Sequence, residues 1–195
     1  GGYVNHNVDT TIAQTAVQIE IDSSDNLYVA YHDNSGDYST HIVKYDSSLS
    51  RQWNHTLDTG SYNESVHGMI LENGYLYVAG NINGNAYGSI TSGDFYDVLV
   101  GKYNISADNW EWQTLMEASN YDEGTGIAMD DTYLYVVGTT KGDLSGESNA
   151  GEDDTFIAKF RKDNGNEEWT VLHGGSYPDL GKEIASEWGA IAHVR

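Results

Sequence analysis

Short runs of hydrophobic residues alternate with polar turns along the whole chain. The first four runs, rich in Val, Ile, Leu, Tyr and Trp, span residues 17–21, 27–31, 41–45 and 52–57. Turns rich in Asp, Asn and Gly, such as 72–74, separate such runs, and this arrangement indicates β-hairpins. No segment carries a convincing helical period, because even in 109–120 the alternation of Trp110 and Trp112 favours a strand. The pattern predicts an all-β protein.

The runs recur at a fixed spacing. Lys44, Lys102 and Lys159 each follow a similar apolar run, at intervals of 58 and 57 residues. Four strands per unit at this period predict a β-propeller of four-stranded antiparallel blades, with about three full repeats plus a partial fourth. A β-sandwich is the structural alternative. We expect a single propeller domain, or a fragment of one, over residues 1–195, with blades at approximately 12–58, 65–116, 124–173 and, in part, 181–195.

The predicted core lies between the blades. The run 76–79 is apolar on both alternating faces, so its strand should be buried on both sides, as in stacked sheets. Aromatic residues that recur at equivalent positions are expected to fill the space between neighbouring blades. They are Tyr28, Tyr77 and Tyr135, and likewise Trp112 and Trp169.

The third unit carries a family resemblance. It reads GTGIAMD at 124–130, LYVVGTT at 134–140 and DDTFIAKF at 153–160, and then passes through Trp169 to Gly174-Gly175. This series resembles the SBBP-type β-propeller repeats of bacterial and archaeal proteins, and the resemblance covers nearly the whole chain. It implies a modular protein, extracellular or on the cell surface, in which the propeller is a non-catalytic scaffold or binding module. The family has no shared catalytic residues to assign.

The fourth unit is incomplete. Residues 181–185 match 124–128, and 190–195 resemble a third strand, but no second strand precedes them. A ring with a partial blade leaves open sheet edges. Three interpretations are open: a fragment of a larger propeller, a compact four-bladed ring whose last blade is reduced or completed by 1–15, or an assembly in which a neighbouring copy fills the edge.

The charge of the chain excludes several partners. Thirty acidic residues against nine basic ones give a formal net charge of −21, so a nucleic-acid backbone would be repelled, and so would an anionic membrane. No apolar run approaches the roughly 20 residues that span a bilayer, so no membrane insertion is expected. The absence of cysteine excludes disulfides and thiolate metal sites. The expected partners are other protein chains, self-association through blade edges, and glycans.

The repeated lysines have a structural interpretation. Lys44, Lys102 and Lys159 recur in a chain with few lysines. We expect each to pair with a carboxylate at the end of a first strand, because such pairs fix strand register. The candidate carboxylates are Asp22, Glu72 and Asp130.

Candidate chemistry is sparse. Residues 33–37 and 152–154 could hold calcium through oxygen ligands, although neither fits the spaced calcium-loop pattern, and Asx-type turns explain both. The seven histidines form no HxH or HExxH arrangement, and His67 is interpreted as a satisfied structural histidine. No GxSxG or phosphate-loop pattern occurs. The sequence therefore predicts no catalytic, cofactor-binding or metal residues, and no enzyme.

Tyrosines in predicted loops are the remaining ligand candidates, since aromatic faces stack on sugars. These are Tyr38, Tyr62, Tyr87, Tyr96, Tyr121 and Tyr177. The leading hypothesis is a non-catalytic structural or protein-interaction module of a secreted or cell-surface protein. The alternatives are a carbohydrate-binding module that uses the loop tyrosines, and a hydrolase on a propeller scaffold.

Overall fold

The computed structural model describes residues 14–33, 39–57, 63–83, 96–118, 120–187 and 190–192, with only the backbone for Asn63, 186–187 and 190–192. This described part of the chain consists of strands and turns, without a helix. The strands are β1 (Gln14–Ile21), β2 (Leu27–Asp33), β3 (Thr40–Tyr45), β4 (Arg51–Thr56), β5 (Asn63–Glu72), β6 (Tyr75–Asn83), β7 (Tyr96–Asn104), β8 (Asn109–Met116), β9 (Asp122–Met129), β10 (Tyr133–Thr140), β11 (Asp154–Arg161), β12 (Glu167–His173), β13 (Ala185–Glu187) and β14 (Ala190–Ala192).

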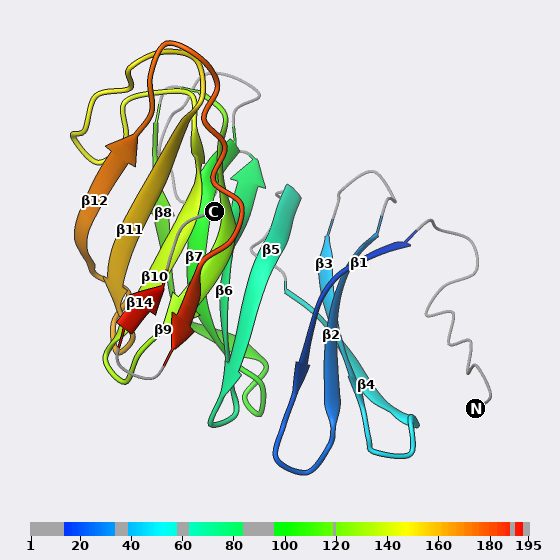
Figure 1. Ribbon diagram of the computed structural model, residues 1–195. Helices are drawn as coiled ribbons and strands as arrows, with labels where there is room; N and C mark the ends of the chain where they lie inside the picture. Colours follow the sequence, from blue (N-terminus) through cyan, green and yellow to red (C-terminus); the bar gives the residue numbers. More distant parts are fainter. Residues whose placement is uncertain are drawn as a thin grey trace.

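The strands form three four-stranded antiparallel sheets and one hairpin. Sheet 1 is β1-β2-β3-β4, sheet 2 is β5-β6-β7-β8 and sheet 3 is β9-β10-β11-β12, each in sequence order, and β13 pairs with β14. The sheets stand side by side, with sheet 2 between the other two (Figure 1). The structure thus confirms the all-β class and the four-stranded antiparallel units. The first strands of the three sheets, β1, β5 and β9, lie next to one another in that order.

Tight hairpins join the strands because Asp side chains bind the turn backbone. Asp22 Oδ1 accepts hydrogen bonds from the amides of Ser24 (2.9 Å) and Asn26 (3.0 Å). The Asn26 side chain donates to the other carboxylate oxygen at 2.8 Å, and these bonds lower the pKa of Asp22 to about 2. In the β5–β6 hairpin, Asn73 and Gly74 both have positive φ, as the Asn-Gly sequence predicts.

A bulge recurs between the first two strands of every sheet. The extra residue lies in the first strand and is Val17 in sheet 1, His67 in sheet 2 and Thr125 in sheet 3. The chain is very tight opposite two of these bulges. A Cβ atom on Gly80 would lie 1.9 Å from Ser65 O, and one on Gly138 would lie 2.0 Å from Glu123 O. The close approach of the first strand explains why glycine stands at these two positions, whereas the equivalent residue of sheet 1 is Tyr31.

The sheets pack by a repeated pairing of unlike faces. We call the face that carries Leu27, Leu76 or Leu134 the Leu face and the opposite one the Tyr face. The Tyr face of sheet 1 packs on the Leu face of sheet 2, and the Tyr face of sheet 2 on the Leu face of sheet 3. Tyr28, Tyr77 and Tyr135 are 4–6% exposed, and residues 76–79 are at most 4% exposed. Burial of the equivalent tyrosines, and of the run 76–79 on both sides, is confirmed.

The equivalent tryptophans do not share one environment. Trp112 packs against the core between sheets 2 and 3, and its indole N–H donates to Lys162 O at 3.2 Å, in the β11–β12 turn of the next sheet. Trp169 stands opposite Lys159, as Trp112 stands opposite Lys102, but it is 40% exposed. The expectation of a core position is wrong for Trp169, because among the described residues no equivalent turn covers it from a next sheet.

The recurring lysines contact aromatic rings rather than carboxylates. Their ammonium groups lie over tyrosine rings of the adjacent strand: Lys44 is 5.1 Å from the Tyr28 centroid, Lys102 is 4.0 Å from Tyr75, and Lys159 is 3.6 Å from Tyr133. Within the described residues none of the three forms an ion pair, so the predicted pairing is wrong.

The three predicted carboxylates have other partners. Asp22 and Asp130 accept hydrogen bonds from the hydroxyls of Tyr28 (3.3 Å) and Tyr135 (2.9 Å). Glu72 pairs instead with Lys162 of the neighbouring sheet, at 2.8 Å. In sheets 1 and 3 a tyrosine thus lies between the repeated lysine and the carboxylate, since Lys44 lies over Tyr28 and Lys159 lies 5.5 Å from the Tyr135 centroid.

Lys162 links sheets 2 and 3 and should respond strongly to substitution. It is 8% exposed and also donates to Asp130 O at 3.0 Å. Lys162→Met should lower the free energy of unfolding by about 2 kcal/mol, because Glu72 is left beside an apolar group while remaining partly solvated. Urea unfolding measures this loss.

The double variant Glu72→Gln/Lys162→Met serves as the matched control. It should regain about half of the loss, since no unpaired charge remains. Equal stability of Lys162→Met and the unmodified chain would show that this pair contributes nothing across the interface.

The fourth unit begins as the first three do. Ile184, 8% exposed, packs against Ala128, Tyr135 and Val137 on the Tyr face of sheet 3. Thr125 Oγ1 donates to Gly181 O at 3.0 Å and holds the segment in place. Residues 190–192 form β14, and their sequence resembles a third strand. Because β14 pairs directly with β13, it takes the second position in the sheet of this unit.

Candidate functional site

A hollow between sheets 2 and 3 brings together aromatic, imidazole, amide and hydroxyl side chains. The hollow has a volume of about 190 Å³ and is lined by Ser65, His67, Asn81, Tyr96 and Tyr121. These residues come from β5, β6, the first position of β7, and the residue before β9. The two sheets pack directly against each other at this point, since β9 contacts both β6 and β7.

The β5 bulge is what places His67 at this hollow. Val66 pairs with Gly80 and Gly68 pairs with Ala79, so His67 is the extra residue and has no partner in the ladder. Bulges commonly redirect a side chain beside a functional site. The His67 ring stands edge-on to His32 of sheet 1, with centroids 5.8 Å apart, and its Nε2 lies 4.0 Å from Glu123 Oε2.

Two tyrosines form a corner of the hollow. The ring centroids of Tyr96 and Tyr121 are 5.1 Å apart and the ring planes meet at 60°. The Tyr121 hydroxyl donates to Glu123 Oε2 at 2.9 Å and accepts from Asn81 Nδ2 at 3.3 Å. Burial, followed by the charge of Glu123, raises the pKa of Tyr121, so the phenol stays protonated. These bonds fix the orientation of the Tyr121 ring.

Both histidines beside the hollow are held neutral. Burial lowers the pKa of His67 and outweighs the opposing charge of Glu123. It lowers the pKa of His32 as well, with a further contribution from His67, although His32 Nε2 lies 3.0 Å from Val66 O. Neutral imidazole is therefore the form expected near pH 7.

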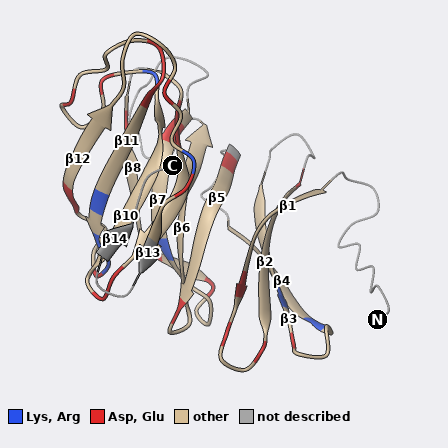
Figure 2. Ribbon diagram, viewed as in Figure 1, with Lys and Arg blue, Asp and Glu red and all other residues tan. Residues whose placement is uncertain are grey.

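Two buried carboxyl groups lie close to this region. Asp97 follows Tyr96 directly and Asp122 follows Tyr121; they are 4% and 0% exposed. Burial is the main cause that raises the pKa of each to about 6, and nearby carboxylates add to it, Glu117 for Asp97 and Asp97 for Asp122. Figure 2, in which Asp and Glu are red, shows acidic positions in the loops at both the upper and the lower ends of the sheets.

The predicted loop tyrosines have different outcomes. Tyr96 and Tyr121 come together in the hollow. Tyr177 is 80% exposed. Tyr38, Tyr62 and Tyr87 lie outside the described residues. His67, Asn81 and Glu123 were not singled out as site residues, because only the stacking of sheets 2 and 3 brings His67 and Asn81 to Tyr121 and Glu123.

The calcium candidates have partners within the protein. Asp154 Oδ2 accepts from the Ala150 amide at 2.7 Å, and Asp153 lies 3.6 Å from Lys141 Nζ. Residues 34–37 fall outside the described part. In the described ranges no group of three or more His, Asp or Glu side chains is placed to hold a metal ion.

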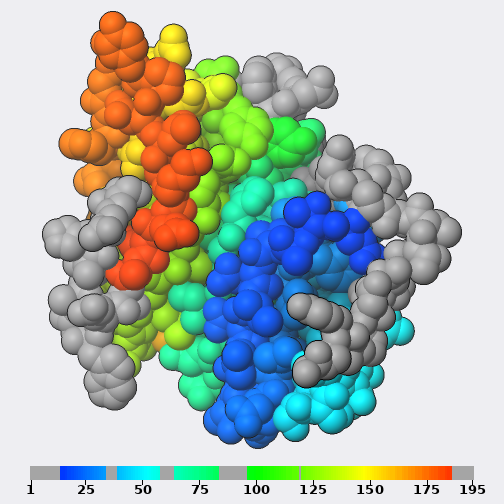
Figure 3. Space-filling model, turned by 45° about the vertical axis from the view of Figure 1, so that its right-hand side comes forward, coloured from blue at the N-terminus to red at the C-terminus, as the bar shows by residue number. Residues whose placement is uncertain are grey.

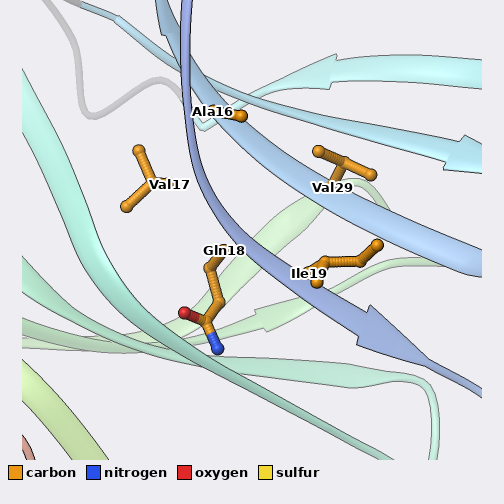
Figure 4. Close-up of a pocket in the computed structure, with 5 residues that line it drawn as sticks. All are labelled: Ala16, Val17, Gln18, Ile19 and Val29. Atoms are coloured by element: carbon orange, nitrogen blue, oxygen red, sulfur yellow. The ribbon is translucent and has the colours of Figure 1, made fainter.

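A second, apolar hollow lies beside β1. It is lined by Ala16, Val17, Gln18, Ile19 and Val29 and has a volume of about 350 Å³. Figure 4 shows Ile19 and Val29 on the same side of sheet 1, while Val17 and Gln18 extend on the side of β5. Figure 3 shows β1, in blue, at the molecular surface next to β5.

Comparison with known proteins gives little. No family model matches the chain, and no curated protein matches it. Among solved structures, the tail fibre of Staphylococcus aureus phage P68 is similar at a TM-score of 0.31 and 13% identity. The match covers 88% of this chain and 43% of the tail-fibre chain. In the described residues no helix is long and apolar enough to span a membrane.

Proposed function

We propose that the chain is a β-propeller module that serves as a non-catalytic structural and protein-interaction scaffold of an extracellular or cell-surface protein. Support for the propeller comes from the stacking. Three like sheets pack Tyr face on Leu face, their first strands adjoin, and β13 begins a fourth unit in the same way. The resemblance of 124–175 to SBBP-type repeats adds the expected modular, surface-exposed setting.

One observation carries the interaction role: the β1 part of the Leu face of sheet 1 is exposed, whereas Val43 and Tyr31 on the same face are 1% and 6% exposed. Ile19 stands opposite Val29, as Met69 stands opposite Val78 and Ile127 opposite Val136. Met69 and Ile127 are 2% and 9% exposed, whereas Ile19 is 53% exposed. Ile21 is 61% exposed, and the apolar hollow lies on the same sheet. An exposed apolar face whose equivalents are interior is typical of an interaction surface.

The occupant that this face fits is another sheet of the same kind. Inside the chain, the Leu face of each following sheet receives the Tyr face of its neighbour. We therefore expect a second copy of the chain to bind here head to tail. In this contact the Leu face of sheet 1 in one copy meets a different surface of the second copy.

A matched pair of variants tests this role. Ile19→Thr/Ile21→Thr keeps β-branched residues in the strand but reduces its apolar area, so it should weaken self-association at least tenfold. Sedimentation velocity over a concentration series measures the change. The control Leu180→Thr alters another residue that is 53% exposed and should leave association unchanged. A chain that stays monomeric, or equal effects of both variants, would refute the interaction role of this face.

A further inference from the structure

Beyond the scaffold role, we infer that the hollow between sheets 2 and 3 binds a small organic ammonium ion. The hollow joins the Tyr96–Tyr121 corner to His67 and Asn81, with the Glu123 carboxylate alongside. Its volume of about 190 Å³ is below the roughly 300–1,000 Å³ of drug-sized sites, so the ligand has to be small.

The electrostatics of the hollow favour a cation. Tyr96 and Tyr121 both line the hollow, and the faces of aromatic rings carry a negative quadrupole that attracts cations. Glu123 lies 2.9 Å from the Tyr121 hydroxyl, while His67 beside it is held neutral. The chain carries a formal net charge of −21, which raises the local concentration of cations. A small ammonium ion therefore gains attraction from the rings, the carboxylate and the long-range field.

Lysine ammonium groups lie close to tyrosine rings elsewhere in the protein, but none lies as close to the Tyr96–Tyr121 corner among the described residues. In each sheet a lysine ammonium lies over a tyrosine ring, at 5.1, 4.0 and 3.6 Å from the centroid. Of the described cations, Lys141 alone approaches the Tyr96–Tyr121 corner; it lies 6.0 Å from the Tyr121 centroid, at the limit of this interaction, and pairs with Asp153. The corner thus retains the capacity to attract a cation from solution.

Unused hydrogen-bonding capacity in the wall points the same way. Asn81 Oδ1 and His67 Nε2 are shielded from solvent and have no hydrogen-bond partner among the described residues. The oxygen is an acceptor, and so is a neutral imidazole nitrogen that carries no proton. Both residues line the hollow, so a ligand there that donates an N–H or O–H would supply the partner that these atoms lack.

The probe that tests this inference is choline chloride, compared with its neutral isostere 3,3-dimethylbutan-1-ol and with methyl glucoside. All three are titrated into the full chain at constant ionic strength, with tyrosine chemical shifts as the readout. Choline should give saturable shifts at Tyr96 and Tyr121 with a dissociation constant of roughly 1 mM, and the isostere should bind at least tenfold more weakly. Equal binding of the isostere, binding of the glucoside alone, or no saturable shift with choline would overturn the inference.

Variants separate recognition from folding. Tyr96→Leu removes one ring face and should weaken choline binding roughly tenfold, whereas Tyr121→Phe keeps its ring and should change binding less than about threefold. Glu123→Gln should also weaken binding, while Tyr177→Leu, far more exposed, should not. Unchanged choline binding by a folded Tyr96→Leu variant would overturn the assignment. This outcome is independent of self-association, so failure here leaves the scaffold role standing.

Discussion

Gly138→Ala is expected to lower the free energy of unfolding by about 3 kcal/mol or more. A Cβ atom at this position would lie 2.0 Å from Glu123 O and 2.5 Å from the Phe156 ring. The first contact is with backbone at the β9 bulge, and the second is with a ring that is 0% exposed. Neither atom is at the end of a flexible side chain, so sheet 3 would have to deform.

Chemical denaturation with urea measures this loss from the transition midpoint. Gly175→Ala is the matched control: nothing lies within 4 Å of the added carbon, and Gly175 is absent from the residues with positive φ. We expect the control to change stability by less than about 0.5 kcal/mol. If Gly138→Ala proves as stable as the control, the close approach of β9 and β10 is not as described. Gly80→Ala should behave as Gly138→Ala does, because its Cβ would lie 1.9 Å from Ser65 O.

Asp97→Asn should stabilise the protein at pH 7.5, by about 1–3 kcal/mol. Burial and the charge of Glu117 raise the pKa of Asp97 from 3.8 to about 6, and about two pKa units correspond to about 3 kcal/mol. The side chain is 4% exposed, and its Oδ1 has no hydrogen-bond partner among the described residues. Loss of the buried charge therefore outweighs the weaker bond that a neutral amide accepts from the Ala118 amide.

The pH dependence of this gain follows from the sign of the shift. A carboxyl group whose pKa is raised on folding binds more protons in the folded state between about pH 4 and pH 6. Asp97 therefore makes the free energy of unfolding of the unmodified chain fall as pH rises from about 4 to about 6. Above pH 6 the free energy of unfolding stays at the lower value. The lowered pKa values of His32 and His67 act in the opposite direction below about pH 6.5. The histidine contributions are the same in both proteins, so they cancel when the free energies of unfolding of the variant and the unmodified chain are subtracted.

Thermal or urea unfolding of both proteins from pH 3.5 to 8 measures that difference. It should be close to zero below about pH 4, grow up to about pH 6 and stay constant above. Asp131→Asn, at an exposed turn position, is the control and should differ by less than about 0.5 kcal/mol at every pH. A destabilising effect of Asp97→Asn at pH 7.5 would contradict the account of Asp97 as a buried charge that lowers the stability of the folded protein.

Spacing in the sequence was enough to predict the sheets, because each repeat forms its own hairpins from local turns and alternation. The spacing did not reveal the bulges at Val17, His67 and Thr125, because a bulge adds one residue to a strand while the apolar run stays recognisable. The exposure of Trp169 could not be predicted from the spacing either. It depends on what packs against sheet 3 and not on the sequence of the strand that carries Trp169. Lys102 shows the same limit, because its partner Tyr75 is set by strand pairing and not by charge.

The candidate site was predictable only in part. Tyr96 and Tyr121 stood out as aromatic residues outside the equivalent core positions. Their proximity depends on the packing of sheet 2 against sheet 3, and on the Glu123 and Asn81 hydrogen bonds that orient one ring. Contacts between side chains of different repeats follow from stacking geometry, which a single sequence does not encode as a visible pattern.

Hydrogen exchange of the β1 amides at increasing protein concentration tests the central claim, that the Leu face of sheet 1 binds other chains. We expect protection of residues 16–21 to increase with concentration, while β11, in the middle of sheet 3, keeps the same exchange rates. Exchange of β1 that does not depend on concentration would contradict the account, since the exposed isoleucine face would then have no partner in another copy.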